Sequence, residues 1–214
     1  MRDVAQRAPC ALLGLLFMGT AARADDVKGA PAPQLEDHSA HVAMARASRY
    51  KTSVQLYDTP EVALTDEQGA GVSLRALLDG PGPVALNFIF TTCTTICPVM
   101  TATFSKMRRE LGPEGEGLSL VSISIDPEHD TPNVLGAYAA RYGAGSGWRF
   151  LTGDAGAILR VLKAFDAFTG SKMNHRPVTF FKAATSRSWF RIEGLASGSD
   201  LAAEYRRLVV APPG

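Results

Sequence analysis

Cys93 and Cys97 are the residues of this sequence best suited to chemistry. They stand four positions apart in the segment NFIFTTCTTICPVM, just after an apolar run. On a helix, this spacing places both thiols on the same side of one turn. Such a pair can form a disulfide, exchange disulfides with another protein or bind a soft metal ion. Two thiolates favour Cu(I), and an imidazole is a common third ligand.

The elements that must position this pair are predicted by hydrophobic patterns. Continuous apolar runs at 83–90 and 118–125 predict strands that are covered on both faces. Between them, apolar side chains three or four positions apart predict a helix: Cys97, Met100, Phe104, Met107 and Leu111. The pair therefore lies where a central strand passes into a helix, whose N-terminus stabilises thiolates. We expect Cys93 to be the more exposed and reactive thiol and Cys97 to point inward.

The rest of the chain continues an alternation of strands and helices. Helices are predicted to begin at Thr131 and Asp154 and to cover 199–209, and strands are predicted at 148–151, 178–181 and 188–192. Two short extended segments, 53–58 and 71–78, come before the first buried strand. This alternation implies a mostly parallel central sheet with helices on both faces. The predicted fold class is α/β, thioredoxin-like, with an inserted strand and helix.

The N-terminal residues indicate export. The apolar run APCALLGLLFMG follows two arginines and precedes Ala22-Arg23-Ala24, which suits a signal peptide over 1–24. Because the run is shorter than the ~20 residues of a membrane span, we expect a soluble exported protein, most simply in a bacterial periplasm. A retained membrane anchor is the alternative. Residues 25–52 are polar and rich in Ala and Pro, which predicts a flexible lead-in to a single domain over 53–210.

Composition excludes some classes of protein. Lys and Arg number 22 against 21 Asp and Glu, without a basic block, so a nucleic-acid partner is not expected. The chain has three cysteines, and Cys10 is lost if the signal is cleaved. Small secreted proteins held by disulfides have more cysteines, spread along the chain. A close pair in an exported protein is therefore more typical of chemistry than of structural stabilisation.

Four histidines are candidates for a third ligand, namely His38, His41, His129 and His175. His175 has the best position, because the loop entering its following strand packs against the cysteine turn in a thioredoxin layout. His129 also follows a predicted strand, in SIDPEHDTP. His38 and His41, together with Met44, suit either a loose copper-capture site or a solvated linker.

The segments FIFTTCTTICPVM and SISIDPEHDTP, with a late Asn-His before a strand, resemble the Sco/SenC family over roughly 53–210. The resemblance implies a thioredoxin fold that binds one copper ion, as Cu(I) or Cu(II), through Cys93, Cys97 and His175. Asp126 matches the family's Asp-Pro motif, either as a turn residue, as an acidic neighbour of the ligands or as an oxygen donor to Cu(II). The implied function is a metallochaperone that helps to assemble the copper centre of cytochrome c oxidase subunit II or of another exported copper protein.

Thiol–disulfide exchange is the alternative function. Cys93 would attack a target disulfide and Cys97 would resolve the mixed disulfide, which keeps a target's copper-site cysteines reduced. Three residues separate the cysteines instead of the two in thioredoxins, so a metallochaperone is favoured over an enzyme. Either function requires a thiol reductant as partner. His175 discriminates between them, because copper binding needs it and thiol exchange does not.

This sequence also departs from the family pattern around the site. Thr94 follows the first cysteine where the family often has proline. Asn174 and Arg176 flank the histidine where the family usually has Asp and then Ser or Thr. Pro177 stands where thioredoxins have a cis-proline, so a cis peptide bond is expected before it.

Overall fold

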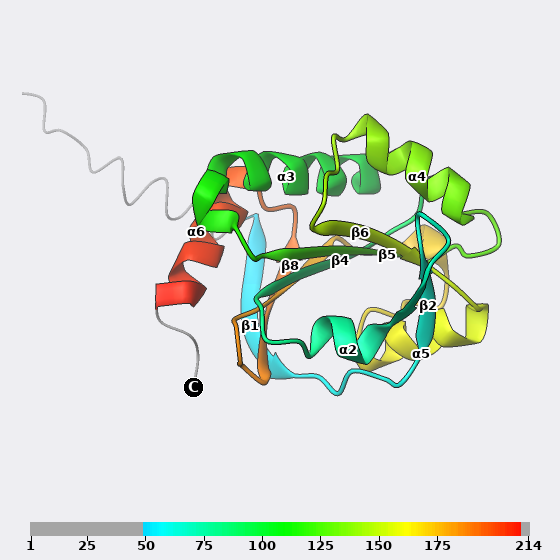
Figure 1. Cartoon of the computed structure of the whole chain (residues 1–214), viewed down its shortest axis with the longest axis horizontal. Helices are drawn as coiled ribbons and strands as arrows, with labels where there is room; N and C mark the ends of the chain where they lie inside the picture. Colours follow the sequence, from blue (N-terminus) through cyan, green and yellow to red (C-terminus); the bar gives the residue numbers. More distant parts are fainter. Residues whose placement is uncertain (1–48, 211–214) are drawn as a thin grey trace, which may run out of the picture. The chain divides into compact units, whose positions relative to one another are not determined.

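In the computed structural model, which describes residues 49–210, the strands form one eight-stranded sheet in the order β1-β8-β7-β4-β5-β6-β2-β3. The strands are β1 (Tyr50–Leu56), β2 (Ala63–Asp66), β3 (Gly71–Ser73), β4 (Val84–Ile89), β5 (Ser119–Ser124), β6 (Trp148–Thr152), β7 (Val178–Lys182) and β8 (Ser188–Gly194). The helices are α2 (Leu74–Leu78), α3 (Ile96–Leu111), α4 (Pro132–Arg141), α5 (Ala155–Ala164) and α6 (Gly198–Val210), with short 3₁₀ turns η1 (Gly112–Gly115) and η2 (Lys172–Asn174). Figure 1 shows α3 and α4 on one face of the sheet and α2 and α5 on the other. The predicted signal peptide and most of the lead-in lie outside the described residues.

The sheet is mostly antiparallel, which corrects the expected mostly parallel sheet. Among the described strands, only the neighbours β4, β5 and β6 run parallel. Strands β7, β8 and β1 on one side, and β2 and β3 on the other, run antiparallel to their neighbours. Helical crossovers join the central strands, whereas hairpins and strands returning from distant parts of the chain extend the edges. The α/β class and the helices on both faces are confirmed.

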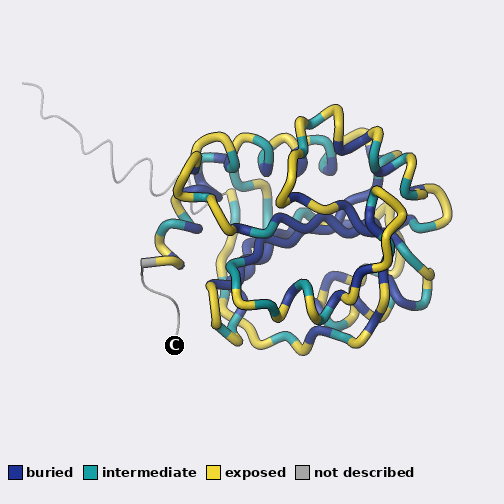
Figure 2. Tube along the Cα trace, viewed as in Figure 1, coloured by how far each residue is buried: buried dark blue, intermediate teal, exposed yellow. Residues whose placement is uncertain are grey.

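Strand β4 lies at the centre of the sheet and is buried along its whole length. Its side chains alternate between two cores. Val84, Leu86 and Phe88 enter the core beneath α2 and α5, whereas Ala85 and Ile89 enter the core beneath α3, α4 and α6. Figure 2 shows the buried centre of the sheet enclosed by helices whose outer faces are exposed. The chain therefore leaves β4 toward the cysteines from a rigid strand.

Helix α3 buries the predicted apolar stripe. All five of its predicted residues are buried: Cys97, Met100, Phe104, Met107 and Leu111. Pro98 lies in the first turn, where a missing N–H breaks no intrahelical hydrogen bond. Burial of the whole stripe fixes the rotation of the helix, and with it the inward direction of Cys97.

Three features before β4 differ from the expectation. The segment 71–78 is a strand only as far as Ser73, whose Oγ accepts a hydrogen bond from the Ala76 N–H and begins α2. Leu74 and Leu78 are both buried and lie about one turn apart on the same face of α2. Strand β2 was not expected, and it forms a hairpin with β3. Strand β1 begins at Tyr50, before the expected start of the domain at Ser53.

Later elements follow the prediction closely. Thr131 and Asp154 cap α4 and α5 by accepting hydrogen bonds from Val134 N–H and Ala157 N–H. Strands β7 and β8 contain the two predicted strand segments 178–181 and 188–192, and they pair antiparallel. The expected cis bond before Pro177 is wrong, because residues 49–210 contain no cis peptide bond. Trans is the ordinary X–Pro form, favoured by about 0.5–1 kcal/mol.

Between residues 49 and 210, no helix combines the length and the apolar character needed to cross a membrane.

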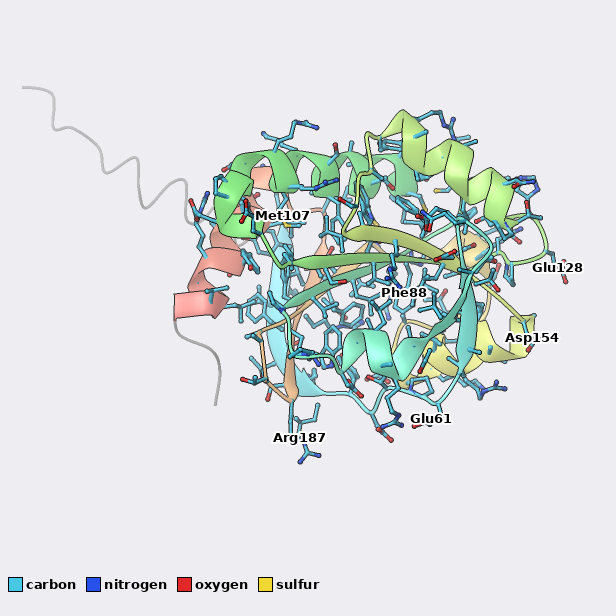
Figure 3. The ribbon with its side chains drawn as sticks, viewed as in Figure 1. Glu61, Phe88, Met107, Glu128, Asp154 and Arg187 are labelled. Atoms are coloured by element: carbon cyan, nitrogen blue, oxygen red, sulfur yellow. The ribbon has the colours of Figure 1, made fainter. Side chains whose placement is uncertain are left out.

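Phe165, at the end of α5, is the centre of an aromatic cluster on the α2 and α5 side. Its buried ring lies 5.2 to 6.3 Å, between centroids, from four other rings: Tyr57, Phe88, Phe180 and Trp189. Figure 3, in which Phe88 is labelled, shows side chains filling the space between the sheet and α2. This cluster supports β4 from the side opposite the cysteines.

Replacing Phe165 by Ala is expected to lower the free energy of unfolding by about 3–5 kcal/mol, because it leaves a cavity among rings that cannot collapse. Urea unfolding measures this loss. Phe168→Ala is the matched control, since that ring is 47% exposed, and it should leave the midpoint close to wild type. Equal effects of the two substitutions would contradict the placement of the cluster.

Candidate metal centre

The cysteine turn, residues 91–97, joins β4 to α3. The Cys93 N–H donates to the Phe90 carbonyl oxygen at 3.2 Å, and the Cys97 N–H donates to Cys93 Sγ at 3.5 Å. Cys93 Sγ also lies 3.6 Å from Thr95 Oγ1. Both thiols are free, with Cys93 9% exposed and Cys97 fully buried. The pair occupies the predicted N-terminus of α3, but Cys93 is more enclosed than expected.

The two thiols differ strongly in acidity. Burial pushes the pKa of Cys93 upward, but hydrogen bonds from Cys97 and Thr95 outweigh burial and lower the pKa to about 7. Burial raises the pKa of Cys97 to about 12; a backbone hydrogen bond with Phe90 opposes the rise, while Cys93 and the Asp130 carboxylate add to it. At neutral pH, one sulfur is therefore a ready nucleophile or ligand and the other keeps its proton. The lower pKa of Cys93 has the direction expected if Cys93 is the more reactive thiol.

His175 reaches the same region from the loop before β7. It is 8% exposed, and its ring centroid lies 6.5 Å from that of Phe90 in an edge-on arrangement. Phe90 also accepts the hydrogen bond from the Cys93 N–H. Phe90 therefore lies between the histidine and the cysteine turn, which brings segments far apart in the sequence to one edge of the sheet.

The His175 ring is neutral and held by the backbone. Its Nε2 lies 2.9 Å from the carbonyl oxygen of Phe88. Because a carbonyl oxygen can only accept, Nε2 carries the proton and Nδ1 has the free lone pair. Burial lowers the pKa of His175, although the Phe88 hydrogen bond opposes this. Neutral imidazole is the form that binds metals, and metal-binding histidines commonly donate their other N–H to a carbonyl group.

The three predicted ligands do not form a closed set in this conformation. Within residues 49–210, no three Cys, His, Asp or Glu side chains are arranged to hold a metal ion. The structure brings the two cysteines into contact and places His175 beside Phe90. The two sulfurs and one imidazole fit Cu(I) by donor type. Binding by all three requires the His175 ring or the cysteine turn to move.

The carboxylate of Asp126 forms an ion pair with Lys172. Its Oδ2 lies 2.6 Å from Lys172 Nζ. Its backbone carbonyl accepts hydrogen bonds from the N–H groups of His129 and Asp130, as a turn residue does. The side chain of His129 is exposed, in contrast to that of His175. His38, His41 and Met44 lie outside the described residues.

Asp130 is a residue of this region that sequence reasoning missed. Its fully buried carboxylate accepts hydrogen bonds from Thr91 N–H at 3.1 Å, Thr91 Oγ1 at 2.5 Å and Ser124 Oγ at 2.5 Å. It therefore joins the start of the cysteine turn to the end of β5. The available signal was its place in SIDPEHDTP, but an Asp before a helix cap is normally an exposed residue near a helix N-terminus. Lys172 was missed as well.

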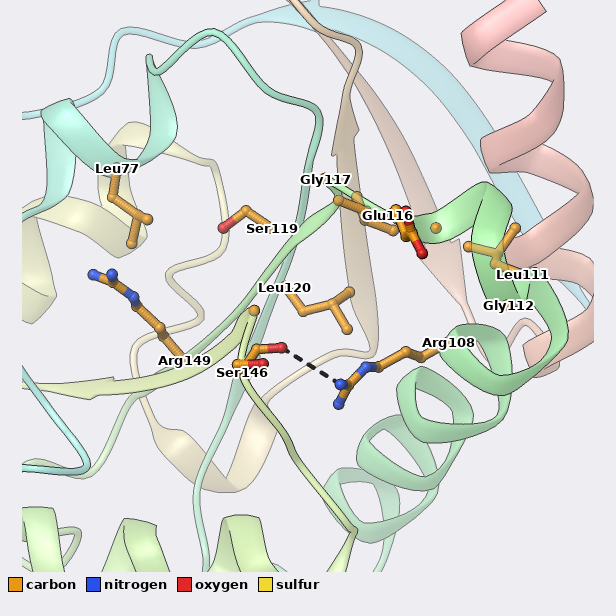
Figure 4. A pocket seen from close by; sticks show the side chains of 13 residues that line it. Leu77, Arg108, Leu111, Gly112, Glu116, Gly117, Ser119, Leu120, Ser146 and Arg149 are labelled. Carbon is orange, nitrogen blue, oxygen red and sulfur yellow. Dashed lines mark hydrogen bonds between the residues drawn. The ribbon is translucent and has the colours of Figure 1, made fainter.

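A hollow of about 540 Å³ at the opposite end of α3 is a less suitable site (Figure 4). Arg108 and Arg149 contribute guanidinium groups to its lining, with backbone from the glycine-rich segment 112–117. Its lining includes neither cysteine nor histidine. The cysteine turn with His175 therefore remains the candidate site.

A family model and a curated relative both match this chain and indicate the same family. The family model described as SCO1/SenC matches residues 50–203, more than half of the chain. The SCO1 protein homolog of Bacillus subtilis (strain 168) is 37% identical over 115 residues, which cover 52% of this chain and 58% of that protein. The chain thus spans little more than half the length of this relative.

Solved structures share the fold. BsSco, described with a disulfide switch and as a member of the Sco family of cytochrome c oxidase assembly proteins, has a TM-score of 0.62 and 26% identity, covering 74% of this chain and 97% of its own. ScoI of Bradyrhizobium japonicum, solved with copper bound, has a TM-score of 0.55 and 22% identity, covering 72% and 99%. These likenesses confirm the predicted thioredoxin-like fold.

Alkylation of the reduced protein by iodoacetamide should modify Cys93 with a rate that is half-maximal near pH 7, because the thiolate is the reacting form and its pKa is about 7. Mass spectrometry of the peptide containing both cysteines measures the rate at each pH. In Cys93→Ser, Cys97 should stay unmodified throughout this range. A midpoint near 8.5, the ordinary value of a free cysteine, would contradict the assigned hydrogen bonds.

Asp130→Asn should lower the free energy of unfolding by about 3 kcal/mol, because an amide replaces a charged acceptor of several buried hydrogen bonds. The measurement is urea unfolding. Asp58→Asn is the matched control, since the Asp58 side chain is 91% exposed, and its midpoint should equal that of wild type. Wild-type stability of Asp130→Asn would show that this carboxylate does not hold the cysteine turn.

Proposed function

The chain belongs to the SCO1/SenC family, and on that premise we propose that it is an exported copper metallochaperone. It binds one copper ion through Cys93, Cys97 and His175. The observation that supports this proposal is that Phe90 contacts both the cysteine turn, through its carbonyl oxygen, and the buried neutral ring of His175, at the edge of the sheet where α3 begins. This donor set suits Cu(I), and the imidazole also supports Cu(II).

The unequal acidity of the thiols suits a cargo that must be both bound and released. Cys93 is largely ready to bind near neutral pH, whereas Cys97 must lose its proton when copper arrives. Binding of Cu(I) therefore releases a proton from the buried thiol to solvent or to the donor. In the reverse direction, protonation of Cys97 favours release. Transfer begins at Cys93, the less buried sulfur, by exchange of one ligand at a time.

The recipient that fits is an exported copper protein, with cytochrome c oxidase subunit II as the leading candidate. The B. subtilis relative is named as a SCO1 homolog, and BsSco is described as an oxidase assembly protein. An oxidising compartment converts the pair into a disulfide, so a thiol reductant must act before copper is loaded. We place the protein in a bacterial periplasm, with a signal peptide at 1–24, a lead-in from residue 25 and a copper-binding domain that begins with β1 at Tyr50 and extends to residue 210.

Thiol–disulfide exchange is the second candidate function, and the difference in pKa between the two cysteines favours it. The Cys93 thiolate attacks a target disulfide and forms a mixed disulfide. Cys97, once deprotonated, displaces the target thiolate, which leaves the target reduced and this pair oxidised. The external thiol reductant then restores both thiols. His175 takes no part in these steps.

His175→Ala should weaken Cu(I) binding by about tenfold or more, because loss of a ligand costs at least as much as loss of a ligand's hydrogen-bond partner. It should also remove the thiolate charge-transfer band of the Cu(II) form. Competition with a chromophoric chelator and optical titration measure these effects, while disulfide exchange with a model substrate should equal wild type.

His129→Ala is the matched control and should bind copper like wild type, since its side chain is exposed. Cys93→Ser and Cys97→Ser should lose both copper binding and exchange. If His175→Ala binds both oxidation states like wild type, His175 is not a ligand, and the exchange function takes precedence.

A further inference from the structure

We propose that Lys172 is a positioning residue for His175: its ion pair with Asp126 holds the turn that carries the histidine beside the cysteine turn. The inference rests on the proposed function, in which His175 binds copper. It assigns a role to a lysine that lies three positions before the ligand, and it changes the role of Asp126.

Asp126 is a fixed anchor. Its side chain is 8% exposed, and its backbone N–H donates to Ser124 Oγ at 3.0 Å. Its carbonyl accepts the N–H groups of His129 and Asp130 at 3.1 and 2.9 Å. Since Ser124 and Asp130 are also hydrogen-bonded to each other, the carboxylate of Asp126 projects from a turn that is rigidly attached to β5.

Lys172 connects this anchor to the histidine. Its Nζ lies 2.6 Å from Asp126 Oδ2 and 5.9 Å from the ring centroid of Phe90. Its backbone carbonyl accepts the N–H of His175 at 3.1 Å. One residue thus contacts the β5 turn through its side chain, the cysteine side through Phe90, and the histidine through its backbone.

The loop around Lys172 has few other attachments. Residues 168–174 are all exposed or half-buried, and η2 is a single short 3₁₀ turn. Of the side-chain hydrogen bonds that residues 169–174 make within the described chain, only that of Lys172 leaves the loop. Most surface ion pairs contribute little, but this one has a buried, preorganised partner. The ion pair between Lys172 and Asp126 therefore restricts the loop 168–174, whose residues are not buried in the core.

The same contact defines what Asp126 does. The ammonium group of Lys172 contacts Oδ2 of the carboxylate that the family resemblance offered as one possible oxygen donor to Cu(II). Asp126 therefore acts through Lys172 and not as a ligand. Copper binding requires a movement of His175 or of the cysteine turn, and the ion pair keeps the histidine turn beside the cysteine turn so that this movement stays small.

The first measurement needs no copper. Amide hydrogen exchange of the His175 N–H should be about tenfold faster in Lys172→Met and Asp126→Asn, because the turn is released, and within about twofold of wild type in Lys172→Arg, which keeps the charge. Lys106→Met, at an exposed lysine on α3, is the matched control and should exchange like wild type. Wild-type exchange in Lys172→Met overturns the proposal.

The second measurement is a double-mutant cycle for Cu(I) affinity. Lys172→Met should weaken binding about 10–100-fold, the usual loss when a ligand's supporting contact is removed, and should cause no further loss in the His175→Ala background. An equal loss in both backgrounds overturns the proposal, because Lys172 would then not act through His175. If wild type does not bind copper, the proposed function fails, and the exchange experiment still decides the role of Lys172.

Discussion

The candidate site depends on the hydrogen bonds that the buried carboxylate of Asp130 accepts. Asp130 binds Thr91, where the cysteine turn begins, and Ser124, where β5 ends. Its own N–H donates to the carbonyl of Asp126. Asp126 in turn holds Lys172, and through it the histidine turn. One short loop after β5 therefore contacts both the cysteine turn and the turn that carries His175, which are more than 75 residues apart in the sequence.

The chemistry follows from unequal burial of similar groups. Cys97 is enclosed by the α3 core and keeps its proton, whereas hydrogen bonds from Thr95 and Cys97 stabilise the thiolate of Cys93. Burial also keeps His175 neutral. In the proposed copper site, this arrangement offers one ready sulfur and one ready nitrogen, and the ligand set is complete only when copper displaces the second thiol proton. Thiol exchange uses the same asymmetry without the histidine.

Sequence patterns predicted the parts of the fold that local periodicity determines. The apolar run of β4, the stripe of α3 and the caps at Thr131 and Asp154 each depend on residues close together in the sequence. The antiparallel edges of the sheet depend on pairing with strands that are distant in the sequence. Strand β2 and helix α2 are short segments with little periodicity. In the same way, spacing and position singled out the cysteine pair and His175 as candidate ligands. The contacts of Asp130 and Lys172 were not, because each joins separate loops that only the tertiary structure brings together.

The central claim is that copper is held by two sulfurs and one imidazole nitrogen. X-ray absorption spectroscopy of the Cu(I)-loaded protein tests it most directly, because it reports the type and number of donors at the metal. The account predicts two sulfur scatterers and one nitrogen scatterer with the outer-shell signature of imidazole, and loss of the nitrogen contribution in His175→Ala. A spectrum with two sulfurs alone, unchanged in that variant, would contradict it.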